Sequence, residues 1–233
     1  MVARSMAAAT LAPMRSRAET TDQALLLRRI PFRESSLVLH LLTRDHGRIA
    51  LLARGARRPS SRMRPHLTLL APLSLRWVEA RCSGMGTLTA VARGRELLPP
   101  SHHLAGLELL ALAARLFHEG DGHGFAECHR SLALLGGFVL PEAGWIAAAL
   151  ELLHRAGWID TLDRCWRCGS PADRLFWSAG GCRCGTCLAG ARGREIGQEL
   201  RRPLAAREFR WDDATLAQGR EIVRTLVRRL VEG

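Results

Sequence analysis

Residues 24–65 read ALLLRRIPFRESSLVLHLLTRDHGRIALLARGARRPSSRMRP, and they contain three short apolar runs separated by turn signals. The runs ALLLRRI, SSLVLHLL and RIALLA have the length of strands, and DHG at 45–47 is typical of a hairpin turn. Two more runs follow, LTLLAPLSLRWVEA (67–80) and TLTAVAR (87–93). Five strands joined by short turns predict a small closed barrel, because an open sheet would expose its edges.

The end of this stretch, ARGARRPSSRMRP (53–65), holds five arginines and no acid. Its glycine and two prolines keep it out of the interior of a regular helix or strand. Because the arginines repel one another, they add no stability by themselves, and an anionic partner is expected opposite them. The alternative is a solvated charge run without a ligand. The arginines are Arg54, Arg57, Arg58, Arg62 and Arg64.

The composition indicates a globular protein with an anionic partner. Of 233 residues, 47% are hydrophobic and 24% charged, and the net charge of +12 favours nucleic acid first and an acidic lipid surface second. No apolar run reaches the roughly 18–20 residues of a membrane span, so we expect no membrane partner. All 34 basic residues are arginine. The absence of lysine excludes P-loop and Schiff-base chemistry.

Charge is distributed unevenly, and this distribution helps to divide the chain. The net charge is +2 over 1–19, +9 over 20–97, −4 over 98–160 and +5 over 161–233. We expect an α+β multidomain protein. Its predicted parts are a disordered N-terminal extension (1–19), a barrel (20–97), a helical domain (98–163), an inserted knuckle (164–188) and the rest of the helical domain (189–233). A transit peptide is the alternative for the extension.

Three segments have helical periodicity. SHHLAGLELLALAARLFHEG (101–120) opens on a possible N-cap, Ser101, and ends at a possible glycine C-cap, Gly120. EAGWIAAALELLHRAG (142–157) follows Pro141, a good first-turn residue, and stops at glycine. DDATLAQGREIVRTLVRRLV (212–231) begins with capping aspartates and carries one apolar stripe. We expect the three helices to bury their apolar stripes against one another. The stripe consists of Leu216, Ile222, Val223, Leu226, Val227 and Leu230.

Five of the seven cysteines lie in CWRCG (165–169) and CRCGTC (182–187). Two C-x2-C pairs separated by 15 residues are typical of a structural tetrahedral zinc site. Disulfides are the alternative, although nothing in the sequence indicates secretion. Cys182 is the alternative to Cys184, whereas Cys82 and Cys128 are expected to be ordinary buried residues. The predicted zinc ligands are Cys165, Cys168, Cys184 and Cys187.

Nothing in the sequence predicts an enzyme. Four cysteines fill a zinc tetrahedron and leave no position for a reacting water. The deaminase pattern, the H-E-x-x-H pattern and the G-x-S-x-G pattern are all missing from the sequence. Asp212 and Asp213 fit a helix cap better than a pair of catalytic acids.

Four stretches together resemble the RecO family of bacterial DNA repair proteins. They are the strand-and-loop segment LLLRRI…SSRMRP, then GTLTAVARGREL, LELLHRAGWIDTLDRCWRCGSP and LFWSAGGCRCGTC. The resemblance implies an oligonucleotide-binding (OB) barrel, a helical domain and an inserted zinc knuckle. It also implies a recombination mediator of the RecF-type pathway, located in the cytoplasm on the nucleoid. Such a protein binds single- and double-stranded DNA, anneals strands and helps to load RecA, with RecR and the tail of single-strand-binding protein as partners.

The chain departs from the family pattern in having arginine throughout and few aromatics. Only Phe32 and Trp77 are aromatic in the barrel, so we expect DNA binding to depend on phosphate contacts and on salt. One alternative is a zinc-ribbon transcription or translation factor that binds nucleic acid through its arginine-flanked knuckle. A second alternative is a nuclease. The predicted DNA-binding residues are Arg28, Arg29, Arg33, Arg48, Arg54, Arg57, Arg58, Arg62 and Arg64.

Overall fold

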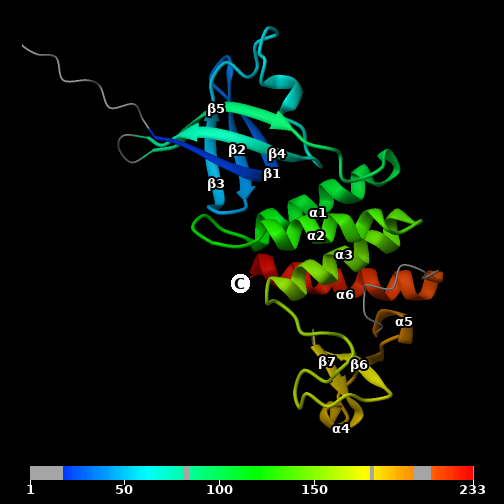
Figure 1. Cartoon of the computed structure of the whole chain (residues 1–233). Helices are drawn as coiled ribbons and strands as arrows, with labels where there is room; N and C mark the ends of the chain where they lie inside the picture. Colours follow the sequence, from blue (N-terminus) through cyan, green and yellow to red (C-terminus); the bar gives the residue numbers. More distant parts are fainter. Residues whose placement is uncertain (1–17, 81–83, 179–180, 202–210, 233) are drawn as a thin grey trace, which may run out of the picture.

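The computed structural model describes residues 18–80, 84–178, 181–201 and 211–232, and Figure 1 shows three parts arranged in series. A β-barrel comes first, a layer of helices lies beside it, and a small sheet lies on the far side of that layer. Residues 1–17 of the predicted N-terminal extension and Cys82 lie outside the described residues. Among the described residues, no helix combines the length and the apolar character that a membrane span requires.

The barrel has the five strands that the sequence predicts. They are β1 (Glu19–Phe32), β2 (Ser36–Thr43), β3 (Gly47–Ala53), β4 (Pro72–Val78) and β5 (Gly86–Arg93), closed in the order β1-β2-β3-β5-β4. The closing pair β3 and β5 is parallel, and all other pairs are antiparallel. This closure leaves no free sheet edge, which confirms the reasoning that favoured a barrel.

Alternating side chains fill the barrel, as a pleated strand requires. Leu39 and Leu41 of β2 point inward beside Trp77 of β4, and all three are fully buried. The long strand β1 pairs with β4 along its first half and with β2 along its second half, with a bulge between Leu26 and Arg28.

One boundary prediction was wrong, because Glu19 belongs to β1 and not to the N-terminal extension. Glu19 pairs in register with Val78 of β4. Its carboxylate also accepts a hydrogen bond from Thr89 and lies 3.3 Å from Nη1 of Arg76. These partners extend the strand beyond the apolar run that the prediction used as its guide.

The helical layer contains α1 (His103–Leu116), α2 (Phe125–Gly136), α3 (Pro141–Arg155) and α6 (Asp213–Glu232). The apolar stripe of α6 is confirmed: Leu216, Ile222, Val223 and Leu226 are buried in the core, and Val227 and Leu230 pack against it. The 3-10 turns η1 (Arg64–His66) and η2 (Pro100–His102) are the remaining helical elements before the cysteine segment.

Helix α2 is absent from the sequence prediction, which found three of the four long helices. Its buried residues Phe125, Cys128, Leu132 and Leu135 are spaced by three, four and three positions, so the helical signal was present. The polar run around His129 and the flanking glycines obscured it. Cys128 is fully buried, as expected.

The two residues predicted to cap α1 do not cap it, whereas the predicted first residues of α3 and α6 are confirmed. Ser101 lies in the 3-10 turn η2 and contacts Nδ1 of His102, so it does not cap α1. The helix ends at Leu116 rather than near Gly120, because the backbone of Phe117 is extended (φ −106°, ψ 130°), and Arg48 binds the carbonyls of Ala114 and Phe117 at this end. By contrast, Pro141 begins α3, and the carboxylate of Asp212 accepts the N–H of Thr215 at 2.8 Å.

The cysteine segment forms a three-stranded sheet between α3 and α6. Its strands are β6 (Leu175–Ser178), β7 (Gly181–Cys184) and β8 (Arg194–Glu195), with β6 in the centre. Two short helices, α4 (Gly185–Leu188) and α5 (Gln198–Arg201), flank β8. The sheet therefore continues past residue 188, since β8 pairs with β6.

The barrel and the helices share an apolar joint. Leu25, Leu27 and Leu42 point out of the barrel and are buried in the same core as α1, α2 and α3. At the β2–β3 turn, Gly47 has φ +64°, and a Cβ built on it would lie 1.6 Å from the carbonyl oxygen of Asp121. Only glycine fits there.

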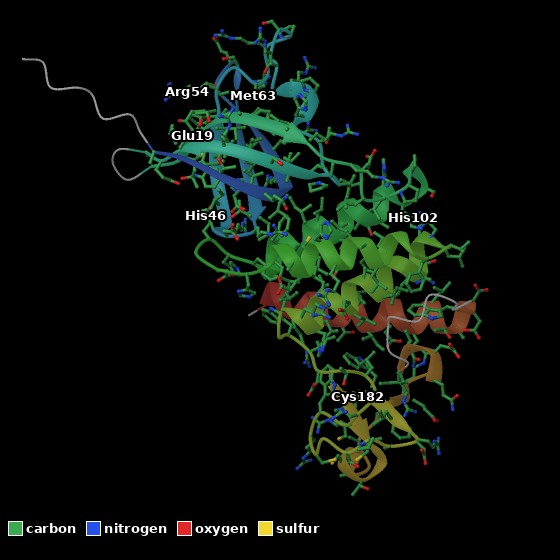
Figure 2. All side chains as sticks on the ribbon, in the orientation of Figure 1. Glu19, His46, Arg54, Met63, His102 and Cys182 are labelled. Carbon is green, nitrogen blue, oxygen red and sulfur yellow. The ribbon has the colours of Figure 1, made fainter. Side chains whose placement is uncertain are left out.

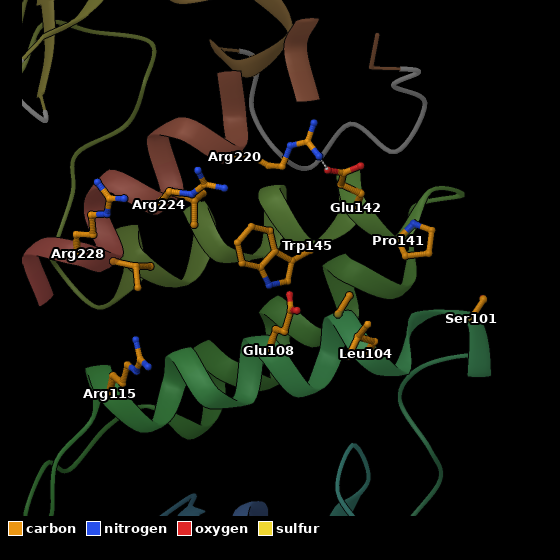
Figure 3. Close-up of a pocket in the computed structure, with 13 residues that line it drawn as sticks. Ser101, Leu104, Glu108, Arg115, Pro141, Glu142, Trp145, Arg220, Arg224 and Arg228 are labelled. Carbon is orange, nitrogen blue, oxygen red and sulfur yellow. Dashed lines mark ion pairs between the residues drawn. The ribbon is translucent and has the colours of Figure 1, made fainter. Parts of the chain in front are cut away.

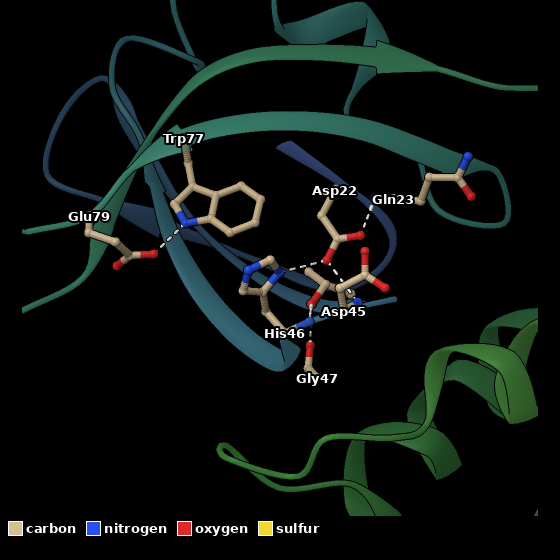
Figure 4. A network of polar contacts seen from close by, with 8 residues as sticks. Asp22, Gln23, Asp45, His46, Gly47, Trp77 and Glu79 are labelled. Atoms are coloured by element: carbon tan, nitrogen blue, oxygen red, sulfur yellow. Dashed lines mark hydrogen bonds and ion pairs between the residues drawn. The ribbon is translucent and has the colours of Figure 1, made fainter. Parts of the chain in front are cut away.

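A buried carboxylate supports the β2–β3 turn from inside (Figure 4). Asp22 of β1 accepts hydrogen bonds from the backbone N–H groups of Gln23 and Asp45 at 2.6 and 2.9 Å. Its second oxygen also lies 2.9 Å from Nδ1 of His46. Burial alone would raise the pKa of Asp22, but the contact with His46 and the two N–H groups together lower it.

We predict that Asp22→Asn lowers the free energy of unfolding by about 2 kcal/mol, because an amide NH2 would face N–H donors. The pKa of Asp22 is lower in the folded state, so its contribution is present above its ordinary value of 3.8 and is lost as the pH falls through the folded value. Urea unfolding at neutral and acid pH measures both effects. The exposed Asp45→Asn is the control, and equal stability of the two variants would contradict this role.

Candidate nucleic-acid interface and metal centre

Two loops that are separate in the sequence meet at the end of the barrel away from the helices. The backbone N–H of Arg57, in the β3–β4 loop, donates to the carbonyl of Ser35 in the β1–β2 turn at 2.9 Å. Its Nη1 donates to the carbonyl of Arg33 at 3.0 Å. Figure 2 shows Arg54 and Met63 at this end of the molecule. The turn and the loop therefore form one surface.

We call this surface the arginine surface, and eight of the nine predicted DNA-binding arginines belong to it. All eight side chains are exposed, and no carboxylate of the described residues lies within ion-pair distance of them. Arg29 is anchored by a bond from Nη1 to the carbonyl of Leu67 at 2.8 Å, and Arg28 lies at the edge, in register with His40. The members are Arg28, Arg29, Arg33, Arg54, Arg57, Arg58, Arg62 and Arg64.

Arg48 lies at the opposite end of the barrel, against the helices. Its Nη1 donates to the carbonyls of Ala114 and Phe117, at 2.8 and 2.7 Å. A cation at the C-terminus of a helix satisfies free carbonyls and opposes the helix dipole. We therefore leave Arg48 out of the candidate DNA surface and assign it to the joint.

The aromatic side chains of the barrel offer one stacking face. Trp77 is 1% exposed and lies inside the barrel, where its Nε1 donates to Glu79 at 2.6 Å. Phe32 is 40% exposed at the arginine surface, and the guanidinium of Arg33 lies 5.4 Å from its ring centroid. A ligand at this surface would meet many cations and a single exposed ring.

Four cysteines come together at the far end of the molecule. One ligand atom from each of Cys165, Cys168, Cys184 and Cys187 lies within 4.8 Å of the other three, and the Sγ atoms of Cys168 and Cys184 are 3.9 Å apart. Zn–S bonds of about 2.3 Å in a tetrahedron give S–S edges near 3.8 Å. The four thiols therefore have a geometry that could hold a metal ion.

The structure separates Cys182 from this cluster. Cys182 lies two residues before Cys184 on β7 and so on the same face of the sheet, but its thiol is not part of the cluster and lies 3.8 Å from the carbonyl oxygen of Leu162. Burial raises the pKa of Cys182 to about 12. A thiol that keeps its proton in an apolar environment is a poor metal ligand.

The electrostatics of the cluster favour a cation. Burial opposes ionisation of Cys165, but the N–H groups of Cys184, Cys168 and Arg167 lower its pKa to about 6. The pKa of Cys187 is raised to about 12, chiefly by hydrogen bonds with the sulfurs of Cys168 and Cys184. Metal binding requires deprotonated thiols, so a bound cation would favour ionisation of the cysteines that hold it.

A groove in the helical layer was not predicted from the sequence (Figure 3). It has a volume of about 720 Å³ and lies between α1, α3 and α6. Leu104, which is 72% exposed, lies at one end of it. Trp145 lines its middle, and the buried Nε1 of this indole has no hydrogen-bond partner. The stripe of α6 indicated its buried face, but no pattern indicated that α1 and α3 stay apart here.

The groove carries unpaired cations. Arg115 of α1 and Arg224 and Arg228 of α6 line it, and within the described part of the chain none of them has an ion-pair partner. Arg220, next along α6, is paired with Glu142. Glu108 is the other acidic residue of the lining.

These features define an OB-barrel protein with a helical layer and a four-cysteine centre. The chain belongs to the Recombination protein O (RecO) family. The model of the family's N-terminal domain matches residues 14–94, and that of its C-terminal domain matches residues 103–233.

Curated relatives of the chain bear the name DNA repair protein RecO. The relative from Cupriavidus pinatubonensis is 34% identical over 170 residues, which are 68% of this chain and 56% of the relative. That from Ralstonia nicotianae is 36% identical over 149 residues, 61% of this chain and 53% of the relative. That from Burkholderia pseudomallei is 46% identical over 100 residues, 42% and 34% respectively. The chain spans about half the length of the curated relatives it matches.

We predict that Cys184→Ser and Cys182→Ser differ in metal content, although only two residues separate them. Replacing Cys184 removes one of the four clustered sulfurs, so bound zinc should fall well below one ion per chain. Cys182→Ser should retain a full ion. Elemental analysis of protein purified without chelator measures this, together with the thiolate absorption of the cobalt-substituted forms. One zinc ion per chain in the Cys184→Ser variant would exclude Cys184 as a metal ligand.

Proposed function

We propose that this protein is a recombination mediator in DNA repair that binds single- and double-stranded DNA and anneals complementary strands. The observation that carries the proposal is the arginine surface: eight exposed arginines, with no ion-pair partner among the described residues, at the end of an OB barrel away from the helices. Membership of the RecO family supports the assignment to DNA repair by the RecF-type pathway.

The ligand opposite the arginine surface is the phosphate backbone. A guanidinium presents a planar fork that matches two phosphate oxygens, and its charge persists at any physiological pH. With Phe32 as the one exposed ring of this surface among the described residues, few bases are held by stacking. Affinity therefore depends on neutralised phosphates, and it is insensitive to sequence and sensitive to salt.

Annealing follows from the same contacts. Two single strands repel each other, and a cationic surface that neutralises both allows complementary bases to meet. Bases must stay free to pair, so phosphate contacts serve annealing better than extensive stacking. This mechanism needs no covalent step and no nucleotide hydrolysis.

The helical groove is the proposed site for the tail of single-strand-binding protein. An acidic peptide with an apolar end would place carboxylates on Arg224, Arg228 and Arg115. Its apolar end would cover Leu104 and Trp145. Docking this tail would bring the protein to coated DNA, where it helps to load RecA. RecR is a second proposed partner, on the basis of family membership, and the site of action is the nucleoid.

We propose zinc as a structural ion of the four-cysteine centre. Cysteine-only coordination suits Zn²⁺, and a complete tetrahedron has no position for a substrate. The ion would hold the two knuckles and the sheet β6–β7–β8 together. The alternative function, a zinc-ribbon transcription or translation factor, would require the knuckle rather than the barrel to provide most of the affinity for nucleic acid.

We predict that replacing Arg57, Arg58 and Arg62 with alanine flattens the slope of log affinity against log salt by about two to three units, since each phosphate contact contributes about 0.7–0.9. Annealing of bare strands should slow in parallel. Fluorescence anisotropy with duplex and single-stranded DNA measures the slope.

The control removes the same charge elsewhere, by replacing Arg130, Arg155 and Arg174, and should leave the slope unchanged. An unchanged slope in the loop variant would exclude this loop from DNA binding. Loss of binding only when the knuckle arginines Arg164, Arg167 and Arg183 are replaced would favour the zinc-ribbon alternative.

We predict that Arg224→Glu lowers affinity for the tail peptide of single-strand-binding protein by about tenfold or more, because it replaces a charge-assisted contact with repulsion. The variant should anneal bare DNA normally and coated DNA slowly. Arg130→Glu, on α2, is the control for net charge. If the two variants bound the peptide with equal affinity, the groove would be excluded as the binding site of this tail.

A further inference from the structure

A second groove lies between the end of α3, the cysteine segment and α6. Its volume is about 780 Å³. None of its lining residues is acidic, whereas the groove between α1, α3 and α6 contains two glutamates. Two tryptophans and three arginines dominate it. The lining residues are Leu153, Trp158, Trp166, Arg167, Gly181, Cys182, Arg183, Leu226 and Arg229.

Trp158 presents an open aromatic face. It follows Gly157, which has φ +77° and ends α3, and its N–H donates to the carbonyl of Leu153 at 2.9 Å. This turn directs the indole away from the helical core, and the residue remains 48% exposed. Within the described residues, its Nε1 makes no hydrogen bond. The half-exposed indole therefore offers an aromatic face on which a planar group could stack.

Trp166 forms a fixed wall of the same groove. Its Nε1 donates to the carbonyl of Thr161 at 2.8 Å, and its backbone N–H donates to the carbonyl of Cys182 at 2.8 Å. The ring meets that of Trp177 edge to face, with centroids 5.7 Å apart. Because Trp166 lies between the ligands Cys165 and Cys168, the wall is anchored to the four-cysteine centre.

Two of the three arginines of the groove, Arg167 and Arg183, are available for an anion. Arg167 is exposed, Arg183 is half-buried on β7, and no acid within the described residues is in ion-pair distance of either. Aromatic faces beside unpaired arginines are the combination by which proteins hold single strands, with a base on the ring and phosphates on the guanidinium groups. A nucleic-acid strand offers both kinds of group in every nucleotide, whereas an acidic peptide would match Trp158 only if it also carried an apolar residue.

We propose that this groove is a second binding site for single-stranded DNA, with a base stacked on Trp158 and the backbone held by Arg167 and Arg183. The site goes beyond the proposed function, because it does not depend on the arginine surface. Figure 2 places Cys182, in the groove, on the other side of the helical layer from Arg54. One molecule would thus hold two separate strands, or two parts of one strand.

The test uses the full chain with Arg57, Arg58 and Arg62 already replaced by alanine, so that the barrel contributes less to the affinity for DNA. Oligo-dT should still bind and should quench tryptophan fluorescence. Adding Trp158→Ala should lower the affinity about tenfold and remove most of the quenching, whereas Trp158→Phe should keep most of the affinity. Adding Arg167→Ala and Arg183→Ala should flatten the remaining salt slope by about one to two units.

The matched control adds Arg130→Ala and Arg155→Ala, which remove the same charge outside the groove. Melting temperature and zinc content are measured for each variant, and only variants that match the parent in both are compared. Equal affinity of the Trp158→Ala variant and its parent would overturn the proposal. Quenching by an acidic peptide but not by oligo-dT would overturn it also, in favour of a protein-docking surface.

The two proposals fail separately. Suppose that oligo-dT binds the groove but the variant with Arg57, Arg58 and Arg62 replaced anneals DNA as well as the unmodified protein. The arginine surface is then excluded as the annealing site, and the groove remains as a DNA-binding site. If this variant does not bind oligo-dT and its tryptophan fluorescence is not quenched, the groove is excluded as a DNA-binding site and the arginine surface remains the one proposed.

Discussion

The docking of the barrel onto the helices is the constraint on which the rest of the structure depends. Three leucines that point out of the barrel, Leu25, Leu27 and Leu42, are buried against the helices. Their burial contributes roughly 5 kcal/mol or more to the free energy of folding. Arg48 adds two hydrogen bonds at the C-terminal end of α1, to the carbonyls of Ala114 and Phe117. This joint uses one end of the barrel for packing. Any ligand must therefore approach the walls or the opposite end, which is where the arginines gather.

The same joint separates the surfaces to which we assign functions. The arginine surface lies at the end of the barrel away from the helices, the groove with Trp145 lies within the helical layer, and the groove with Trp158 lies against the cysteine segment. The helices thus act as a spacer between two basic regions. A spacer of this kind suits a protein that brings nucleic acids together, because strands on opposite sides do not compete for the same cations. It also leaves the middle of the molecule free for a protein partner.

Much of the fold could be predicted from local patterns, and the exceptions share a physical cause. The strands follow from alternating apolar residues and the DHG turn, and the four-cysteine cluster follows from its spacing, which also distinguishes Cys184 from Cys182. The end of α1 could not be predicted, because a residue distant in sequence, Arg48, caps it. The same holds for the two grooves: their walls come from elements far apart in the chain, and no local pattern encodes how closely those elements approach.

The contact at Gly47 constrains how this chain can change in length. The tip of the β2–β3 hairpin meets the backbone of Asp121 so closely that even a methyl group does not fit. An insertion in residues 44–46 would act as a wedge and separate the barrel from the helices. In the β3–β4 loop, residues 57–60 are exposed and can change in number without disturbing that joint, whereas Leu67 and Leu70, nearer β4, are buried. Length variation, and with it the reach of the basic surface, is therefore confined to one end of the barrel.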